Sequence, residues 1–421
     1  MTVASVLKRP AKEYSYFLSL PQTTRVLLIT NMVYAFVLPV IEIFVGAYIM
    51  RNSNDPSKVA AYQLSVYTGI PITFYINGFL LRRVKISNLY SFGMLLSGFS
   101  MVIMMSLTNL SSLGISVAGI LMGCSFGFFW ANRDYLALNS TDDSTRNYYY
   151  GLETFFYTIT YIIIPIIVGY FLMSTEQSNW LGGNINMAYR IVTVAVFLLT
   201  IVSSIMIHQG DFKNPVQKKF VFFKFHSLWK KLIALASLKG LAQGYLVTAP
   251  AILIMRLVGN EGSLGMVQGV SGVLTAFLLY LLGRTTKPSH RIYIFSVGLF
   301  IFLIGTIVNG ILFSATGVVF FVLCKVLFTP LHDIAYFPIE MKVIDVVAKI
   351  ENRNEFAYIF NHEFGLYIGR FAGLILFICL AQYVSEDFAL KYALIIIAFV
   401  QLASIPLAKN IITKANQLTG V

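Results

Sequence analysis

The sequence predicts an all-α integral membrane protein with 12 transmembrane helices, arranged as two six-helix bundles with both termini in the cytoplasm. Three observations support this fold class. Hydrophobic residues make up 57% of the 421 residues. Charged residues make up only 12%, about half the share of a typical soluble domain. Long apolar runs recur along the chain, and the basic residues gather between them in a regular pattern.

The composition excludes a soluble enzyme, a disordered chain and a secreted domain held together by disulfides. The three cysteines, Cys124, Cys324 and Cys379, lie inside apolar runs and are expected to act as small hydrophobic side chains. The chain has no G-x-x-x-x-G-K-[ST] motif, which argues against an ATP-driven pump. We find no nucleophile–base constellation either. We therefore expect no enzyme activity, no metal site and no resident cofactor.

Twelve segments are long enough to span a bilayer, whose core of about 30 Å needs about 20 apolar residues in a helix. Six lie in the first half of the chain, at 26–50, 59–81, 88–108, 112–138, 148–173 and 188–208. Six lie in the second half, at 231–257, 261–283, 291–314, 316–340, 355–383 and 387–408.

The distribution of Lys and Arg predicts the orientation. With the N-terminus inside, the cytoplasmic segments and the helix ends beside them hold 22 of the 31 basic residues, the outer side holds 5, and 4 lie within spans. This excess follows the positive-inside rule. The net charge of +13 is therefore explained by the basic residues of the cytoplasmic segments, and no nucleic-acid partner is expected. We expect a multi-pass protein of the plasma membrane, which is the inner membrane in a bacterium, and a monomer in the bilayer.

The longest connection divides the chain into two halves. Residues 1–208 form the predicted N-terminal bundle, 209–230 a basic cytoplasmic linker and 231–421 the C-terminal bundle. Lysines alternate with aromatic residues along this linker, which favours an amphipathic segment on the anionic leaflet; a regulatory, lipid-sensing segment is the alternative.

The two halves share a weak internal repeat. Span 4 ends in Trp130–Tyr135, which contains Arg133 and Asp134, and span 10 ends in Leu331–Tyr336, which contains His332 and Asp333. A polar loop follows each of them, at 139–147 and 342–354. The next span then carries a glutamate about two turns in, Glu153 and Glu363 respectively. Parallel six-span repeats are a known architecture of transporters.

With this repeat, the chain resembles the major facilitator superfamily over its whole length. Between spans 2 and 3 the family often has G-x-L-x-D-R-x-G-R-R. This chain has Gly78 and Leu80 in the matching places followed by basic residues, and it lacks the Asp and the second Gly. The family's span 5 motif is hinted at by Pro165 and Gly169. The resemblance implies that spans 1, 4, 7 and 10 line a central cavity and that 3, 6, 9 and 12 face lipid.

Ionisable side chains inside a membrane are costly and are functional candidates by default. Glu42, Lys325 and Arg370 fall near the middle of spans 1, 10 and 11. A lone carboxyl in a low-dielectric cavity can be protonated near neutral pH, so Glu42 is the candidate proton carrier; a structural hydrogen bond or an ion pair is the alternative. Lys325 and Arg370 could hold a carboxylate or phosphate of the substrate, or form internal salt bridges.

A second group of charges lies nearer the cytoplasm. It comprises Arg133, Asp134, Glu153, His332, Asp333, His362 and Glu363. The resemblance implies that span 4 meets span 11 and span 5 meets span 10 at a cytoplasmic gate. Arg133 is therefore expected to pair with Glu363, and Glu153 with His332 or another basic group of span 10, when this gate is closed. Pairing within one half, such as Asp134 with Arg146, is the alternative.

Polar and aromatic residues on the spans expected to line the cavity could complete a substrate site. The candidates are Asn31, Tyr34, Trp130, Asn132, Tyr157 and Gln243. Together with the charges they predict a secondary transporter that moves a small polar organic solute by alternating access. An anionic solute is the version in which Lys325 and Arg370 bind it. H⁺ is the expected coupling ion and Na⁺ the alternative.

Three alternatives remain at this stage. A proton-driven efflux pump or flippase for amphipathic compounds or lipids is the first, since aromatic residues are 15% of the chain. A divalent metal transporter is the second, because two histidines stand beside acidic residues. A membrane-embedded enzyme or a receptor is the least supported.

Overall fold

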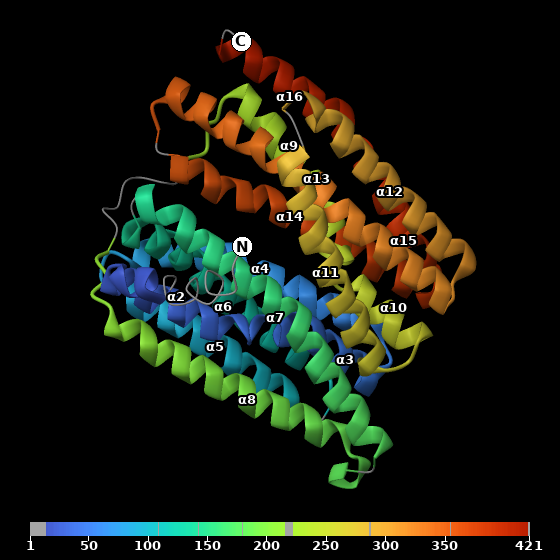
Figure 1. Cartoon of the computed structure of the whole chain (residues 1–421). Helices are drawn as coiled ribbons and strands as arrows, with labels where there is room; N and C mark the ends of the chain where they lie inside the picture. Colours follow the sequence, from blue (N-terminus) through green and yellow to red (C-terminus); the bar gives the residue numbers. More distant parts are fainter. Residues whose placement is uncertain are drawn as a thin grey trace, which may run out of the picture.

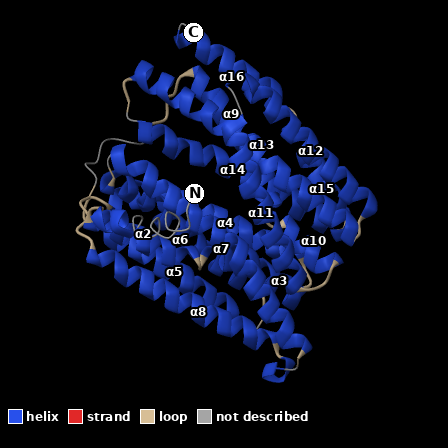
Figure 2. Ribbon diagram, viewed as in Figure 1, coloured by secondary structure: helices blue, strands red, loops and turns tan. Residues whose placement is uncertain are grey.

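The computed structural model describes residues 14–107, 109–141, 143–178, 180–214, 222–285, 288–353 and 355–419. These residues form helices joined by short loops, with no strand among them (Figure 2). Eleven helices of the described chain are long and apolar enough to cross a membrane. A twelfth, α4 (Pro56–Leu80), has the length, but its sequence is more polar. The twelve-helix fold predicted from the sequence is confirmed.

The elements of the first half are α2 (Gln22–Ala35), the π-helical turn η1 (Val40–Phe44), α3 (Val45–Ser53), α4, α5 (Ile86–Ser106), α6 (Ser112–Ser140), α7 (Asp143–Gln177), η2 (Trp180–Gly183), α8 (Ile185–Met206) and η3 (Ile207–Gln209). Those of the second half are α9 (Ser227–Leu246), α10 (Ala249–Leu257), α11 (Glu261–Thr285), η4 (Pro288–His290), α12 (Arg291–Leu312), α13 (Ala315–Glu351), α14 (Glu355–Tyr383), α15 (Glu386–Gln401) and α16 (Ser404–Thr419).

The helices pack as two bundles that lie side by side (Figure 1). In the first bundle α6 packs against α4 and α5, and α8 packs against α5. In the second, α9 packs against α14, and α12 packs against α13 and α15. The bundles meet mainly through α3 with α10, α4 with α14 and α7 with α11, and α4 also touches α9. Following the orientation expected from the sequence, we call the end with the α3–α4 and α10–α11 loops the outer end, and the end with the termini and the central connection the inner end.

Small polar residues start several helices at the outer end. Asp55 accepts a hydrogen bond from the Ser57 backbone N–H at 2.8 Å at the start of α4. Ser111 and Ser314 accept equivalent bonds from Gly114 and Gly317. These caps satisfy backbone donors that have no partner within the helix, so the sharp outer loops follow from the local sequence.

The first helix of each bundle is interrupted at a matching place. α2 ends at Ala35, and a turn at 36–37 leads to Pro39 and η1. α9 ends at Leu246, and a turn at 247–248 leads into α10, which has Pro250 in its first turn. A proline inside a helix removes one backbone donor and clashes with the preceding turn. The two interruptions follow a shared Tyr-x-x-x-x-Pro pattern, which begins at Tyr34 and Tyr245.

The structure corrects the two polar loops expected at the inner end. The segment predicted as a loop at 139–147 is mostly helical, since α6 continues to Ser140 and α7 begins at Asp143. Most of 342–354 belongs to α13, which continues to Glu351. Polar residues are compatible with a helix once it leaves the lipid, so hydropathy marks the membrane boundary and not the helix end. In the expected linker, residues 215–221 lie outside the described part of the chain.

Candidate functional site

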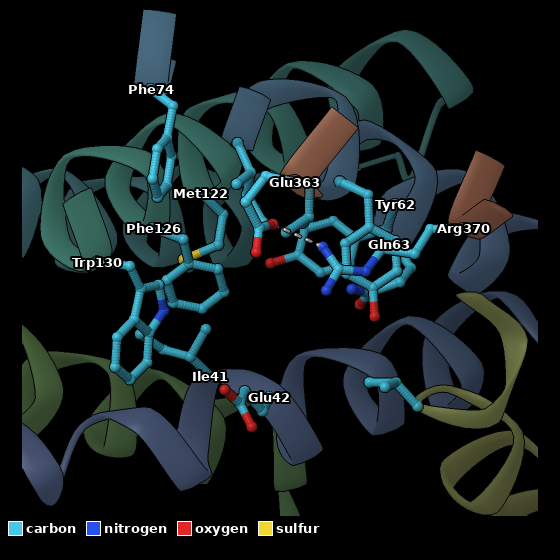
Figure 3. Close-up of a pocket in the computed structure, with 14 residues that line it drawn as sticks. Ile41, Glu42, Tyr62, Gln63, Phe74, Met122, Phe126, Trp130, Glu363 and Arg370 are labelled. Carbon is cyan, nitrogen blue, oxygen red and sulfur yellow. Dashed lines mark ion pairs between the residues drawn. The ribbon is translucent and has the colours of Figure 1, made fainter. Parts of the chain in front are cut away.

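A cavity of about 280 Å³ lies between the bundles, below the joined outer ends. Helix α4 supplies much of its wall, through Tyr62, Gln63, Tyr67 and Phe74 among others. The sequence analysis did not single out these residues, although the low hydropathy of this span was a usable signal. In Figure 3 aromatic side chains, including Trp130, stand on one side of the cavity. The wall can therefore hold an apolar or aromatic group.

Glu42 projects into this cavity from the interrupted first helix (Figure 3). Its neighbours Ile41 and Ile43 are 2% and 9% exposed, whereas Glu42 is exposed to the cavity although it lies midway along the span. The Tyr161 side chain is within hydrogen-bonding reach of its carboxylate, and no ion pair of that carboxylate within 4.0 Å is found among the described residues. The π-helical turn thus presents a carboxyl group to the cavity without a neutralising partner at contact distance.

Arg370 enters the cavity from the opposite side, on α14. Its Nη1 lies 3.5 Å from Glu363 Oε2, the ion pair drawn as a dashed line in Figure 3. Its Nε and Nη2 donate to Gln243 Oε1 at 3.2 and 3.0 Å, and the guanidinium lies 4.9 Å from the Tyr67 ring centre. Gln243, expected to touch substrate, therefore contacts Arg370, and the Arg370 charge already has a carboxylate beside it.

A second cavity, of about 360 Å³, lies between α7, α11 and α13. Lys325 and Tyr157 line it, together with Ile43 of the π-helical turn. Glu42 and Lys325 are close enough to interact electrostatically, although no ion pair of 4.0 Å or less joins them. Consecutive residues of the first helix therefore face two different cavities.

At the inner end of the first bundle, Arg133 is the centre of a charged cluster. Its Nη1 donates to Asp134 at 2.7 Å, and its Nε donates to Glu153 Oε1 at 3.1 Å, with a second, shorter contact to the other carboxylate oxygen. The Glu153 side chain is 1% exposed. Asn31, expected in the cavity, donates to Glu153 at 2.6 Å. The cluster ties α2, α6 and α7 together within one bundle.

The second bundle has its own cluster at the same depth. The Lys239 ammonium of α9 lies 2.9 Å from Asp333, which also contacts His332 at 3.0 Å. His362 Nδ1 lies 3.2 Å from Glu340, a partner that the sequence analysis did not identify. In this conformation Arg133 pairs with Glu153 and not with Glu363, and Glu153 does not pair with His332. The cross-gate pairs stay a prediction for the conformation with a closed inner end, and the Arg146 side chain lies outside the described residues.

At the outer end, by contrast, a charged group crosses between the bundles. Arg51 of α3 donates to Glu261 of α11 at 2.6 and 2.7 Å, and to Glu176 of α7 at 3.1 and 3.0 Å. Tyr189 donates to Glu261 at 3.0 Å. Arg51 was not predicted as a functional residue. The usable signal is an arginine on the expected outer side, where the positive-inside rule disfavours one.

Three expected substrate contacts prove to be part of the first bundle's interior. Asn31 is 1% exposed and bonds to Tyr149 and Glu153. Tyr34 is fully buried and donates to Ser97 at 3.0 Å. Asn132 exchanges hydrogen bonds of 2.8 and 3.1 Å with Asn77 of α4. None of the three lines either cavity, because each polar side chain is used to join helices of its own bundle.

The four candidate metal ligands do not converge. His332, Asp333, His362 and Glu363 are each engaged in the separate ion pairs given above. In the part of the chain that the structure describes, no group of three or more His, Cys, Asp or Glu is placed to hold a metal ion. The observations give the metal-transport alternative no support.

Sequence comparison finds relatives without an assigned activity, and no family model matches the chain. An uncharacterized Bacillus subtilis (strain 168) protein, YqgE, is 24% identical over 369 residues, which are 84% of this chain and 81% of that protein. An uncharacterized Geobacillus stearothermophilus protein, from the region 3′ of sodM, is 26% identical over 146 residues. That match covers 35% of this chain and 68% of that protein.

Solved structures show the fold. The peptide transporter POT, in a complex with sulfate, aligns with a TM-score of 0.66 at 12% identity, over 94% of this chain and 96% of that chain. The nucleoside transporter NupG aligns with a TM-score of 0.63 at 12% identity, over 93% and 99%. A bacterial homolog of the human lysosomal transporter Spinster aligns with a TM-score of 0.62 at 13% identity, over 94% and 98%. The resemblance drawn from the sequence is thus confirmed at the level of structure: this chain has the fold of the major facilitator superfamily.

Proposed function

We propose that this protein is a proton-coupled secondary transporter that moves a small organic solute across the plasma membrane by alternating access. The observation that carries the proposal is the Glu42 carboxyl, which faces a cavity between two bundles from an interrupted transmembrane helix. Broken helices at the interface of repeated halves commonly form ion and substrate sites in secondary transporters. The transporters named among the structural neighbours support the same class.

The conformation supports alternating access. Ion pairs cross between the bundles at the outer end, through Arg51 and Glu261. At the inner end, the pairs of Arg133 with Glu153 and of Lys239 with Asp333 each stay within one bundle. The cavity lies between these two levels. We infer an inward-facing state, in which the outer end is sealed and a solute exchanges with the cytoplasm.

Glu42 is the proposed proton carrier. A carboxyl group that has no ion pair within 4.0 Å can take up and release a proton as its surroundings change between the two conformations. Na⁺ is the alternative coupling ion. The two cavities and their mixture of aromatic, hydroxyl and charged groups suit a small polar or amphipathic solute better than a bare ion.

The test begins with purified protein in detergent and a panel of acidic, neutral and basic organic solutes, because ligand binding raises thermal stability by mass action. The strongest stabiliser is then used for uptake into proteoliposomes with an imposed pH gradient. Uphill uptake should disappear with a protonophore and in Glu42→Gln, while that variant keeps its stabilisation by the solute. Glu386→Gln, at the outer start of α15, is the matched control. Uphill uptake that survives in Glu42→Gln would remove Glu42 from the coupling role.

A second candidate is efflux or flipping of an amphipathic compound. An apolar cavity of about 710 Å³ lies between α4 and α14, next to the central connection. Phe222, Phe223 and Phe225 line it, with Phe360 and Phe364 of α14. This cavity could hold an acyl chain beside the transport path. The same solute panel decides between the two functions: stabilisation by lipids or bulky cations, and not by small polar solutes, favours efflux or flipping.

A further inference from the structure

The second cavity is lined by a lysine, Lys325, whose ammonium group has no hydrogen-bond or ion-pair partner among the described residues. No carboxylate of those residues lies within 4.0 Å of it. A buried lysine offers three donors, and leaving them unsatisfied in a membrane is costly. Thr329 Oγ1 donates to the backbone carbonyl of Lys325 at 3.0 Å, so this hydrogen bond does not involve the ammonium.

Neutral donors surround this charge. Gln268, Ser271 and Thr275 follow one face of α11 at the i, i+3 and i+7 spacing of a helix and all line the cavity. Their side chains have no hydrogen-bond partner in the part of the chain that is described. On α7, the Tyr157 hydroxyl is buried and also has no partner. The wall thus combines one cation with several free hydroxyl and amide groups, which is the donor set that an anion requires.

Arg370 offers a weaker site for an anion. Its guanidinium has Glu363 at 3.5 Å and donates two hydrogen bonds to Gln243. An anion there would meet a second negative charge in the same cavity, whereas Lys325 is the only charged side chain in the lining of its own. The contrast separates two residues to which the sequence analysis gave one shared role.

We propose that the cavity between α7, α11 and α13 binds the carboxylate of a small monocarboxylic acid through Lys325, and that Glu42 competes with this carboxylate for the lysine. One cation with neutral donors matches a single negative charge, and a volume of about 360 Å³ limits the acid to a small molecule. The inference rests on the proposed function and names its substrate class.

The competition links the acid to the proton. The titratable groups that interact with Glu42 are Lys325 of α13, Tyr34 of α2, Tyr67 of α4 and Tyr161 of α7, which is within hydrogen-bonding reach of its carboxylate. Arg370 lines the same cavity as Glu42 and is paired with Glu363. Among the described residues, Lys325 is therefore the cation near Glu42 that has no carboxylate within 4.0 Å. When Glu42 is ionised, its carboxylate attracts the lysine and repels an entering anion. When Glu42 takes up a proton, the lysine is available to the substrate. Binding of one proton therefore strengthens binding of one carboxylate, and the reverse follows by linkage.

The charge balance fixes the stoichiometry. The empty site holds the Glu42 carboxylate and the Lys325 ammonium, which sum to zero. The loaded site holds a protonated Glu42, the ammonium and one substrate carboxylate, which again sum to zero. Neither the loaded nor the empty carrier moves net charge, so symport is electroneutral. The pH gradient drives uptake, and the membrane potential does not.

The first experiment measures thermal shifts of purified protein with three matched pairs: acetate and acetamide, benzoate and benzamide, and 3-phenylpropionate and its amide. The acids should stabilise the protein and the amides should not. Lys325→Gln should remove this difference, whereas Lys391→Gln, on α15 beside Phe313, should keep it. The unliganded melting temperature and the size-exclusion profile confirm that each variant folds. Acids and amides that stabilise equally, or a difference that persists in Lys325→Gln, would overturn the site.

The second experiment measures binding and uptake of the acid that stabilises most, as a function of pH. Wild-type affinity should rise about 5- to 150-fold as Glu42 is protonated, the usual range of such coupling. Glu42→Gln should bind tightly at every pH. Uptake into proteoliposomes should follow a pH gradient and be unchanged by a K⁺/valinomycin potential. Potential-driven uptake, or equal pH dependence in Glu42→Gln, refutes the competition. If a neutral solute shows Glu42-dependent uphill uptake instead, the anion site fails and the proposed function stands.

Discussion

Arg51 and Glu261 connect the two bundles through a bidentate ion pair, with Nε–Oε1 and Nη2–Oε2 distances of 2.6 and 2.7 Å. The Glu261 side chain is fully buried, whereas Arg51 has a second partner, Glu176, which is 47% exposed. In the proposed transport cycle this pair must break when the outer end opens. The ion pair is asymmetric, because the carboxylate has one cation and the cation has two carboxylates.

This asymmetry predicts different effects of the two neutralising substitutions. Arg51→Gln leaves the buried Glu261 carboxylate without a cation. Removing one partner of a buried ion pair lowers the stability of the structure by about 3–5 kcal/mol. Glu261→Gln leaves Arg51 paired with Glu176 and should cost less. Both should shift the protein toward the outward-facing state, Arg51→Gln more. Reactivity of a reporter cysteine at the outer end with an impermeant maleimide measures the shift, with Arg190→Gln as the control. Equal reactivity in the two variants would contradict the ranking.

The Arg133–Glu153 pair predicts a non-additive stability change. Arg133→Gln leaves the buried Glu153 carboxylate with only Asn31 and tyrosine donors, so we expect a loss of about 3–5 kcal/mol. The double variant Arg133→Gln/Glu153→Gln removes both charges and should be more stable than Arg133→Gln alone. Melting temperatures in detergent for the two single variants and the double variant give the coupling. A double variant that is the sum of the singles would show that the pair does not act as a unit.

The contact between α7 and α11 predicts a strong effect of one methyl group. A Cβ added at Gly169 would lie 2.6 Å from the Glu261 carbonyl oxygen and 3.0 Å from the Gly265 Cα, so the helices would have to separate. Gly151, on the same helix, has nothing within 4 Å of its added Cβ. Gly169→Ala should therefore destabilise the conformation described here, while Gly151→Ala should be neutral or stabilising by up to about 1 kcal/mol. Thermal melting compares them directly, and equal melting temperatures would exclude tight packing here.

The inward-facing assignment predicts which residues of the second interrupted helix can be labelled from the cytoplasmic side. Val247, at the break between α9 and α10, is 39% exposed and lines the central cavity, whereas Leu253 is fully buried. In a background without the native cysteines, Val247→Cys should react with a thiol reagent added on the cytoplasmic side of oriented vesicles, and Leu253→Cys should not. Labelling of Val247→Cys chiefly from the outer side would mean that the inward-facing assignment is incorrect.

The sequence predicted the spans well, because hydropathy depends on the bilayer and not on tertiary contacts. It located the inner helix ends poorly, since residues such as Lys349 and Glu351 are polar and still helical. It also singled out Glu42 and Lys325, because a charge in an apolar run is conspicuous, and both side chains line cavities. The partners of Arg133 could not be read from the same pattern, because neighbouring helix faces within a bundle and across the gate offer carboxylates of equal chemistry.

The resemblance to a family predicted some of the residues that line the cavity and missed others. It implied a central cavity lined by spans 1, 4, 7 and 10. Glu42, Trp130 and Val247 of spans 1, 4 and 7 line the first cavity, whereas Lys325 of span 10 lines the second. It gave no reason to expect span 2, yet Tyr62, Gln63 and Tyr67 of that span line the same cavity as Glu42. Asn31 and Asn132 were singled out as polar residues on the right spans. Their helical faces turn toward other helices of the bundle, which only packing decides.

The paired breaks at 36–37 and 247–248 have a consequence for the number of states in the transport cycle. Each separates a long inner segment, α2 or α9, from a short outer one, α3 or α10, and the two outer segments pack against each other. These outer segments can tilt together while the inner ones keep their positions. The cycle is then expected to contain an occluded intermediate, in which the solute is enclosed on both sides and neither aqueous compartment can reach it.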